Sequence, residues 1–148
     1  MRQSGFPDRF LEELLVEVDM MPKADVPDMP TAADTKIIME GVAKGFSDRN
    51  SGAGIRAYWV VDEASATYKT FAGTKAEVSA AIKEWMGARR NKDHLGEFVH
   101  LGFIGGNPAW ATNGGFSNEE LGSVIFTGNT PGASNAFYSY LVAHELTH

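Results

Sequence analysis

The amino-acid sequence predicts an α/β (α+β) fold, in which a mixed, twisted sheet of about four strands carries two packed helices and is followed by a C-terminal helix. Two observations predict this class. Stretches with the periodicity of strands and of helices follow one another in the order strand, helix, strand, helix, strand, strand, helix. Two of the helices also begin with capping patterns. The length of 148 residues is that of about one domain, so we expect a single domain over residues 1–148.

The first strand and the first helix are predicted near the N-terminus. Residues 14–20 alternate, with Leu15, Glu17 and Asp19 on one face and apolar side chains on the other. This alternation predicts a strand with one buried face and one solvated acidic face. The sequence TAAD at residues 31–34 is a capping-box pattern, and apolar side chains follow it at helical spacing. We therefore expect a helix from about Ala32 to Phe46.

The middle of the chain predicts a second strand and a second helix. Residues 55–64 are rich in β-branched and aromatic side chains, which favours a central strand. The sequence TKAE at residues 74–77 is a stronger capping box, because Glu occupies its last position. The apolar spacing that follows predicts a helix that ends at about Ala88 or Arg89.

The last third of the chain predicts two more strands and a final helix. Residues 97–106 form the third expected strand, which ends at paired glycines. Residues 108–121 are typical of a long loop, and residues 122–129 of a short fourth strand between turn residues. Either Thr130 or Ser134 can cap the final helix, which we expect to run to the end of the chain.

Composition and charge exclude several classes of protein. The net charge is −6 and the basic residues are scattered, whereas a nucleic-acid-binding protein normally has a basic patch. No run of about 18 apolar residues exists, so we expect no membrane span. The absence of cysteine excludes a disulfide framework and a thiolate zinc site. No signal peptide is visible, so a secreted parent protein would carry its signal upstream.

The sequence AHELTH at the end of the chain contains the candidate chemistry. On a helix, His144 and His148 stand four residues apart on one face, so both imidazoles can point at one metal ion with Zn–N bonds of about 2.0–2.1 Å. Glu145 lies about 100° around the helix from His144. It is therefore placed beside the metal, where a general base can take a proton from water.

A different interpretation of this motif is a solvated helix end with two surface histidines, which the helix dipole favours. The context argues for the metal site. The motif falls on an independently predicted helix directly after a strand, and Leu141, Val142 and Leu146 would bury one side of that helix.

At these residues the chain resembles the zincin metallopeptidases, most of all the metzincin branch. LLVEVDMMP is similar to an acidic, methionine-containing first strand of some bacterial members. FVHLGFIGG, the loop after it and GSVIFTGN are similar to the inner strand and the edge strand above the zincin cleft, and AHELTH is similar to the zinc helix. The resemblance implies a zinc ion bound by His144 and His148, with Glu145 as the general base. It also implies an edge strand that binds an extended peptide through backbone hydrogen bonds. The residues of this expected edge strand are Ser123, Val124, Ile125, Phe126 and Thr127.

The family pattern also implies a third zinc ligand after His148. In metzincins it is a histidine six residues further on, and in thermolysin-like enzymes a glutamate on a later helix, so the branch stays open. A catalytic zinc site needs three protein ligands and a water. We therefore expect the chain to be the N-terminal part of a longer peptidase that alone binds zinc weakly and cleaves nothing. The alternative is a complete small protein that has lost the reaction.

Three functional hypotheses follow from these residues. The first is a zinc-dependent endopeptidase acting on a peptide or protein. The second is a non-catalytic module of the same fold that binds peptide or metal, and the third is a metal-dependent hydrolase of another amide or ester. His94 and His100 could touch a second metal, but a surface loop histidine and a satisfied strand histidine are the expected roles. Tyr138 and Tyr140 could stabilise an oxyanion, but packing is the expected role.

Overall fold

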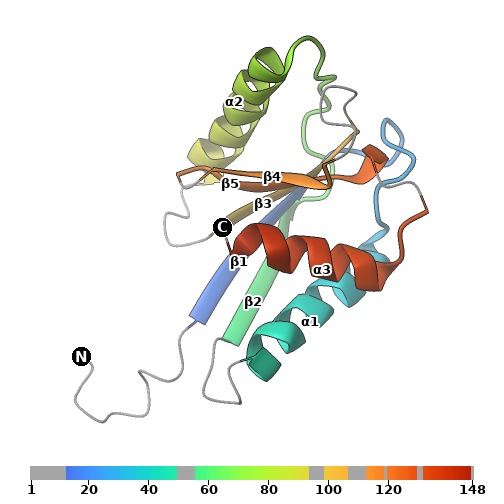
Figure 1. Cartoon of the computed structure of the whole chain (residues 1–148), viewed down its shortest axis with the longest axis vertical. Coiled ribbons are helices and arrows are strands. Elements are labelled where there is room, and N and C mark those ends of the chain that lie inside the picture. Colours follow the sequence, from blue (N-terminus) through green and yellow to red (C-terminus); the bar gives the residue numbers. More distant parts are fainter. Residues whose placement is uncertain are drawn as a thin grey trace.

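A computed structural model describes residues 13–49, 56–93, 99–106, 113–118, 120–129 and 132–147. The strands are β1 (Glu13–Met20), β2 (Arg56–Glu63), β3 (Val99–Ile104), β4 (Gly115–Asn118) and β5 (Gly122–Phe126). They form one five-stranded sheet in the order β2-β1-β3-β5-β4 (Figure 1). Strands β1, β2, β3 and β5 are parallel, and β4 is antiparallel to β5. The mixed α/β class is thus confirmed, with one strand more than expected.

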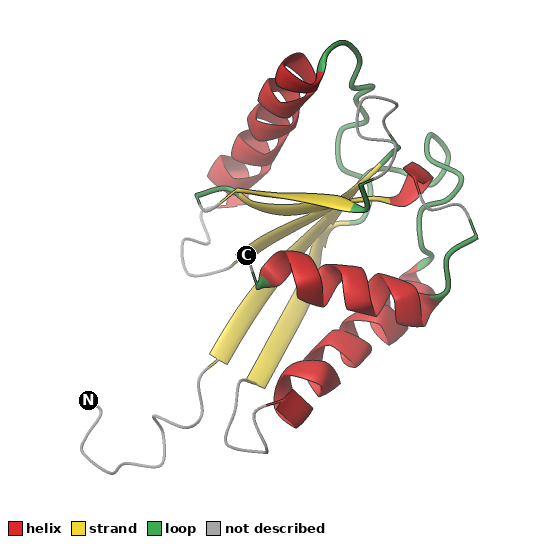
Figure 2. Ribbon diagram, in the orientation of Figure 1, coloured by secondary structure: helices red, strands yellow, loops and turns green. Residues whose placement is uncertain are grey.

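The connections between the parallel strands determine where the helices lie. The chain passes from β1 through α1 (Ala32–Arg49) to β2 in one direction, and then returns through α2 (Lys75–Asp93) across β1 to β3. Crossovers between parallel strands are almost always right-handed, so two crossovers in opposite directions place their helices on opposite faces. Figure 2 shows α2 on one side of the sheet, with α1 and α3 (Asn135–Leu146) on the other.

Side-chain contacts confirm the two layers. On the α2 face, an added Cβ at Gly102 of β3 would lie 2.7 Å from the Trp85 ring, so the glycine lets the helix approach the sheet closely. On the other face, Thr35 of α1 contacts the Met20 sulfur. Helix α3 packs on α1, where the Ser139 hydroxyl donates to the Ile38 carbonyl at 2.8 Å.

The predicted caps are confirmed at both helices. The Asp34 N–H donates to the Thr31 hydroxyl at 3.1 Å. At α2 the capping box is reciprocal, because the Thr74 N–H donates to Glu77 and the Glu77 N–H donates back to the Thr74 hydroxyl. The Thr74 backbone N–H and then the Thr74 side chain hold the pKa of the Glu77 carboxyl below its ordinary value. Of the two candidate caps for α3, Ser134 is the N-cap.

The core fills the space on both faces of the sheet. It is rich in methionine, since Met20, Met21, Met29, Met39 and Met86 are all buried. Among the described residues, no helix is long and apolar enough to cross a membrane.

The expected central position of residues 55–64 is wrong. In the described part of the sheet, β2 is a terminal strand that pairs with β1 alone. Its side chains alternate between exposed and half-buried, and Tyr58 and Val60 are exposed. A β-branched and aromatic composition fits any pleated, half-buried surface, and it does not distinguish a central strand from a terminal one.

The expected solvated face of the first strand is also wrong. Glu17 is 2% exposed and Asp19 is fully buried. The reason is that β1 lies between β2 and β3 in the interior of a sheet with helices on both faces. Alternation along one strand reports side-chain polarity, but not whether a neighbouring layer covers the polar face.

The expected edge position of residues 123–127 is also wrong. The expected loop of residues 108–121 contains β4, and β4 occupies the edge position that we assigned to residues 123–127. Strand β5 pairs with β3 on one side and with β4 on the other, so it offers no free edge. The physical reason is that β4 folds back antiparallel to β5 through a tight connection at Gly122, where φ is +104°.

Candidate active site on the last turn of helix α3

His144 and Glu145 lie in the last turn of α3, as the sequence predicts. The helix ends at Leu146, earlier than the expected run to the end of the chain, and the Thr147 hydroxyl donates to the His144 carbonyl at 2.8 Å. His144 is exposed, whereas its neighbour Glu145 is 8% exposed. His148 lies outside the described residues, so the expected convergence of the two imidazoles is not tested.

Glu145 is buried because α3 packs closely on the edge strand β4. An added Cβ at Gly115 would lie 2.8 Å from Glu145 Cγ and 2.7 Å from the Val124 carbonyl oxygen. One turn earlier on α3, an added Cβ at Gly114 would lie 2.8 Å from a Leu141 methyl group. Two successive glycines thus let the Glu145 side chain lie directly against the strand.

Two serine hydroxyls from neighbouring strands bind Glu145. Ser117 of β4 donates to Glu145 Oε1 at 2.6 Å, and its hydroxyl also lies 3.1 Å from the Glu145 carbonyl oxygen. Ser123 of β5 lies 3.0 Å from the Ser117 hydroxyl and 3.3 Å from the same carbonyl. A hydroxyl-to-oxygen distance of 2.6 Å is in the range of hydrogen bonds to charged carboxylates. Ser117 and Ser123 therefore hold Glu145 against the strands β4 and β5.

The exposed side of α3 carries aromatic rings next to His144. The Tyr140 ring stacks on the His144 ring with centroids 6.2 Å apart, and Phe137 stacks on Tyr140 at 6.3 Å. Tyr140 is 60% exposed, so the expected packing role does not describe its position. Tyr138, in contrast, is buried as expected, and its hydroxyl donates to the Thr127 carbonyl at 3.4 Å.

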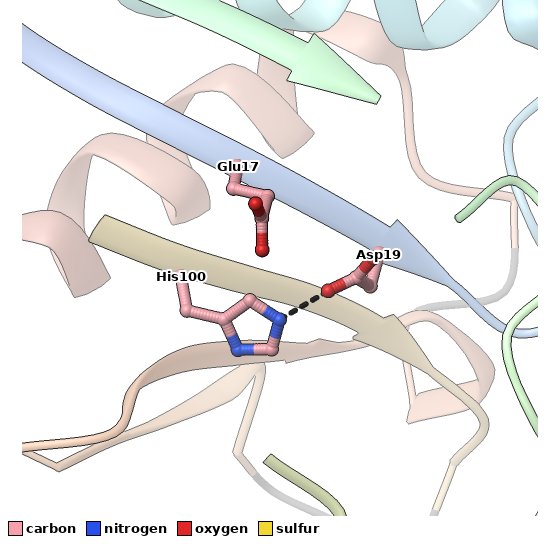
Figure 3. Close-up of side chains that lie close together, drawn as sticks. All are labelled: Glu17, Asp19 and His100. Carbon is pink, nitrogen blue, oxygen red and sulfur yellow. Dashed lines mark hydrogen bonds and ion pairs between the residues drawn. The ribbon is translucent and has the colours of Figure 1, made fainter. Parts of the chain in front are cut away.

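A second group of chemically active side chains lies on the opposite face of the sheet. Glu17 of β1 pairs directly with His100 of β3, and Asp19 follows on the same face (Figure 3). His100 Nε2 contacts Asp19 Oδ2, and the Glu63 N–H donates to Asp19 Oδ1 at 3.1 Å. One ring nitrogen of His100 is thus bound by an aspartate that we placed in solvent, whereas Nδ1 is buried without a hydrogen-bond partner among the described residues, so the expected satisfied strand histidine is confirmed only in part. His94 lies outside the described residues.

This inner group is close enough to share a metal ion, since one ligand atom from each residue lies within 4.8 Å of the others. The hydrogen bonding around His100 argues against a metal site. A metal-bound histidine usually donates from its other ring nitrogen to an acceptor. His100 Nδ1 is buried and has no hydrogen-bond partner among the described residues. The arrangement fits a buried hydrogen-bonded histidine–aspartate pair better than a metal centre.

Sequence reasoning missed Gly115 and Ser117, because both fell in the predicted loop. The available signal was weak. The stretch GGFSN alternates over only four residues, which is at the lower limit for predicting a strand. Ser123 was included as an edge-strand residue, but the structure brings its hydroxyl, and not a free backbone edge, to the site.

Comparison with known proteins gives no independent assignment. No protein-family model matches the chain, and no curated protein matches it either.

Proposed function

We propose that the protein is a zinc-dependent metalloendopeptidase of the zincin type. One observation carries the proposal: at the end of α3, Glu145 is directed at the edge strand while His144 opens to solvent. A metal ligand needs access to an ion, and a general base needs a fixed orientation beside it. His144 and Glu145, which are consecutive residues of α3, meet these two requirements.

The side chains at this end of α3 suit a zinc ion. His144 is exposed and offers an imidazole, which is a common zinc ligand. His148, four residues later in the sequence, would add a second imidazole. When bound, zinc polarises the scissile carbonyl and makes an attacking water more acidic.

Glu145 performs the proton transfers in this proposal. Its carboxylate accepts a proton from the attacking water and passes it to the departing amine, so that one side chain acts first as base and then as acid. Burial beside β4 excludes most bulk water from the carboxylate, which strengthens its electrostatic effect on the reacting groups.

The substrate of this proposal is an extended peptide that adds to β4. Within the described sheet, β4 is a terminal strand and pairs with β5 alone. An extended peptide can pair with such an edge through backbone hydrogen bonds. Gly115–Asn118 thus replaces the residues 123–127 that we expected to bind the substrate.

The second candidate is a non-catalytic module that binds peptide or metal without turnover. It is favoured by the same contact that orients Glu145, since Oε1 already accepts a hydrogen bond from Ser117. Turnover decides between the two candidates. Peptide, amide and ester substrates assayed with and without zinc would also separate a peptidase from a hydrolase of other bonds.

Glu145→Gln, made in the full-length protein, tests the proposal directly. Gln is nearly the same size as Glu and cannot act as a base, so we expect zinc content to be kept and the rate to fall by about 10²–10⁴-fold. His144→Ala should lose both zinc and activity, because it removes a ligand. Zinc content by elemental analysis and hydrolysis of a peptide substrate are measured together for both variants.

Glu84→Gln is the matched control, because Glu84 is an exposed glutamate of α2 far from the motif in sequence. It should keep both zinc and activity. Near-normal turnover by Glu145→Gln would exclude Glu145 as the base. Equal loss of zinc from the Glu145 and His144 variants would instead make Glu145 a ligand.

A further inference from the structure

The Glu145 carboxylate is held by a residue of another element, the edge strand. We propose that Ser117 is a positioning residue: its hydroxyl fixes the orientation of the Glu145 carboxylate, and Ser123 in turn orients that hydroxyl. The inference rests on the proposed function, in which Glu145 is the base. It goes beyond it by assigning a role to two serines outside the zinc-binding motif.

The direction of the hydrogen bonds follows from counting protons. Ser117 has one hydroxyl proton and three possible acceptors, and the carboxylate oxygen at 2.6 Å is both the nearest and the only charged one. A hydroxyl donates preferentially to such an acceptor. The Ser123 proton is then available for the Ser117 oxygen at 3.0 Å. The two hydroxyls form a chain that ends on Glu145, and each hydrogen bond in such a chain polarises the next.

The contact with Gly115 also restrains the conformation of the Glu145 side chain. A glutamate side chain has three rotatable torsions, and a base that samples several rotamers is in the reactive orientation for only part of the time. Here Cγ lies against the backbone of Gly115, where even a methyl group would not fit. Ser117 binds the carboxylate itself, and it thereby restrains the outer torsions about Cβ–Cγ and Cγ–Cδ that the contact at Cγ leaves unspecified.

The same atoms can serve after Glu145 has taken a proton. A protonated carboxyl can donate to the Ser117 oxygen, and Ser117 can then donate to the Glu145 carbonyl oxygen at 3.1 Å. Ser123 can donate to that carbonyl at 3.3 Å. Only hydroxyl protons rotate in this exchange, so the carboxyl group keeps its place between accepting and returning the proton.

Ser117→Ala tests the inference in the full chain loaded with zinc. We expect kcat to fall about 10- to 100-fold while KM changes little, because the variant misplaces the base and leaves the peptide-binding backbone intact. Ser117→Thr keeps the hydroxyl on a strand that tolerates β-branched residues, so it should restore most of kcat. Ser123→Ala should have a smaller effect in the same direction.

Ser139→Ala is the matched control. Ser139 is also a half-buried hydroxyl, but it donates to the Ile38 carbonyl on α1 and does not contact Glu145. Its kcat should stay at the wild-type value. Equal losses of kcat in Ser139→Ala and Ser117→Ala, or a normal kcat in Ser117→Ala beside an inactive Glu145→Gln, would overturn the inference and leave the proposed function standing.

A measurement independent of turnover separates the two proposals. Three-bond scalar couplings report the torsions of the Glu145 side chain in solution. We expect one rotamer in the wild type and in Ser117→Thr, and averaging over several in Ser117→Ala. An unchanged single rotamer in Ser117→Ala refutes the positioning role. Absence of zinc-dependent hydrolysis by the wild-type full-length protein refutes the proposed function, whatever the rotamer measurement shows.

Discussion

Each face of the sheet buries a carboxylate, and the two carboxylates differ in what surrounds them. Asp19, on the α2 face, is fully buried and is bound by the His100 ring and by a backbone N–H. Glu145, on the α3 face, lies at the end of a helix, is bound by hydroxyls and has an exposed histidine as its neighbour. Burial of a carboxylate alone is therefore not evidence of a functional site. The two carboxylates differ in whether a neighbouring side chain that could bind a ligand is exposed to solvent.

The partners of the two carboxylates also differ in chemistry. The Asp19 network extends to Glu63, whose own carboxylate lies 3.2 Å from the Arg89 guanidinium on α2. The network therefore includes a carboxylate–guanidinium pair, Glu63 and Arg89, and such a network is costly to break in the interior. The Glu145 network consists of neutral hydroxyls that can reverse their direction. We expect the first network to maintain the fold and the second to serve a reaction.

The largest effect should come from breaking the inner network. Asp19→Ala leaves His100 and the Glu63 N–H without their acceptor, and each buried polar group left without its partner costs about 1–3 kcal/mol. Urea denaturation measures this loss. Asp19→Asn is the matched variant, because its amide oxygen can still accept the Glu63 N–H, and it should lose less stability. Reduced zinc content in a folded Asp19 variant would mean that the inner group is a metal site after all.

A smaller effect should come from Gly115→Ala, which acts on the face of Glu145. The added methyl group would collide with Glu145 Cγ and with the Val124 carbonyl. Such overpacking typically costs about 1–3 kcal/mol, and it should lower turnover as well by displacing the base. Stability in urea and turnover are measured on the same preparation.

Gly45→Ala provides the control for the glycine substitution. Its added Cβ meets no atom within 4 Å, and Gly45 lies inside α1. Ala is the better helix former, so this variant should gain about 0.5–1 kcal/mol of stability and keep its activity. A Gly115→Ala protein with full stability and full turnover would show that the close contact of α3 with β4 is not required.

The smallest effect concerns the link between the N-terminal ends of α1 and α3. The Asn135 amide donates to Asp34 at 3.1 Å, and this hydrogen bond, with that from Thr31, holds the pKa of Asp34 below its ordinary value of 3.8. A lowered pKa in the folded state means that the stabilisation is present above the unfolded pKa and is lost as the pH falls through the folded pKa. Asn135→Ala should therefore be slightly less stable than the wild type at neutral pH.

The pH series provides the check on this small effect. Below pH 3.8 the stability difference between Asn135→Ala and the wild type should shrink, because Asp34 becomes protonated in both. Unfolding curves in urea at successive pH values measure it. A difference that does not change with pH would assign the loss to packing and not to the charge of Asp34.

The sequence predicted those features that depend on nearby residues. The caps at Thr31 and Thr74 and the helical position of His144 and Glu145 follow from spacings of a few residues, and the structure confirms these placements. The direction in which Glu145 points could not be predicted. It depends on Gly115, which is thirty positions away and belongs to a strand too short to recognise.

The burial of Glu17 and Asp19 could not be predicted for a related reason. Their alternation with apolar residues is the pattern of a half-exposed strand. What buries them is the return of the chain through α2, which covers their face, and the arrival of His100 beside them. These contacts are long-range, and periodicity along one strand contains no information about them.

Strand β4 has a consequence for how binding and chemistry communicate. The strand that would pair with an extended peptide is also the one from which Ser117 reaches Glu145. A peptide that stabilises β4 would stabilise the held carboxylate, and by thermodynamic reciprocity a correctly held carboxylate would favour peptide binding by the same factor. Peptide binding to β4 and the correct orientation of the Glu145 carboxylate would then depend on the same equilibrium.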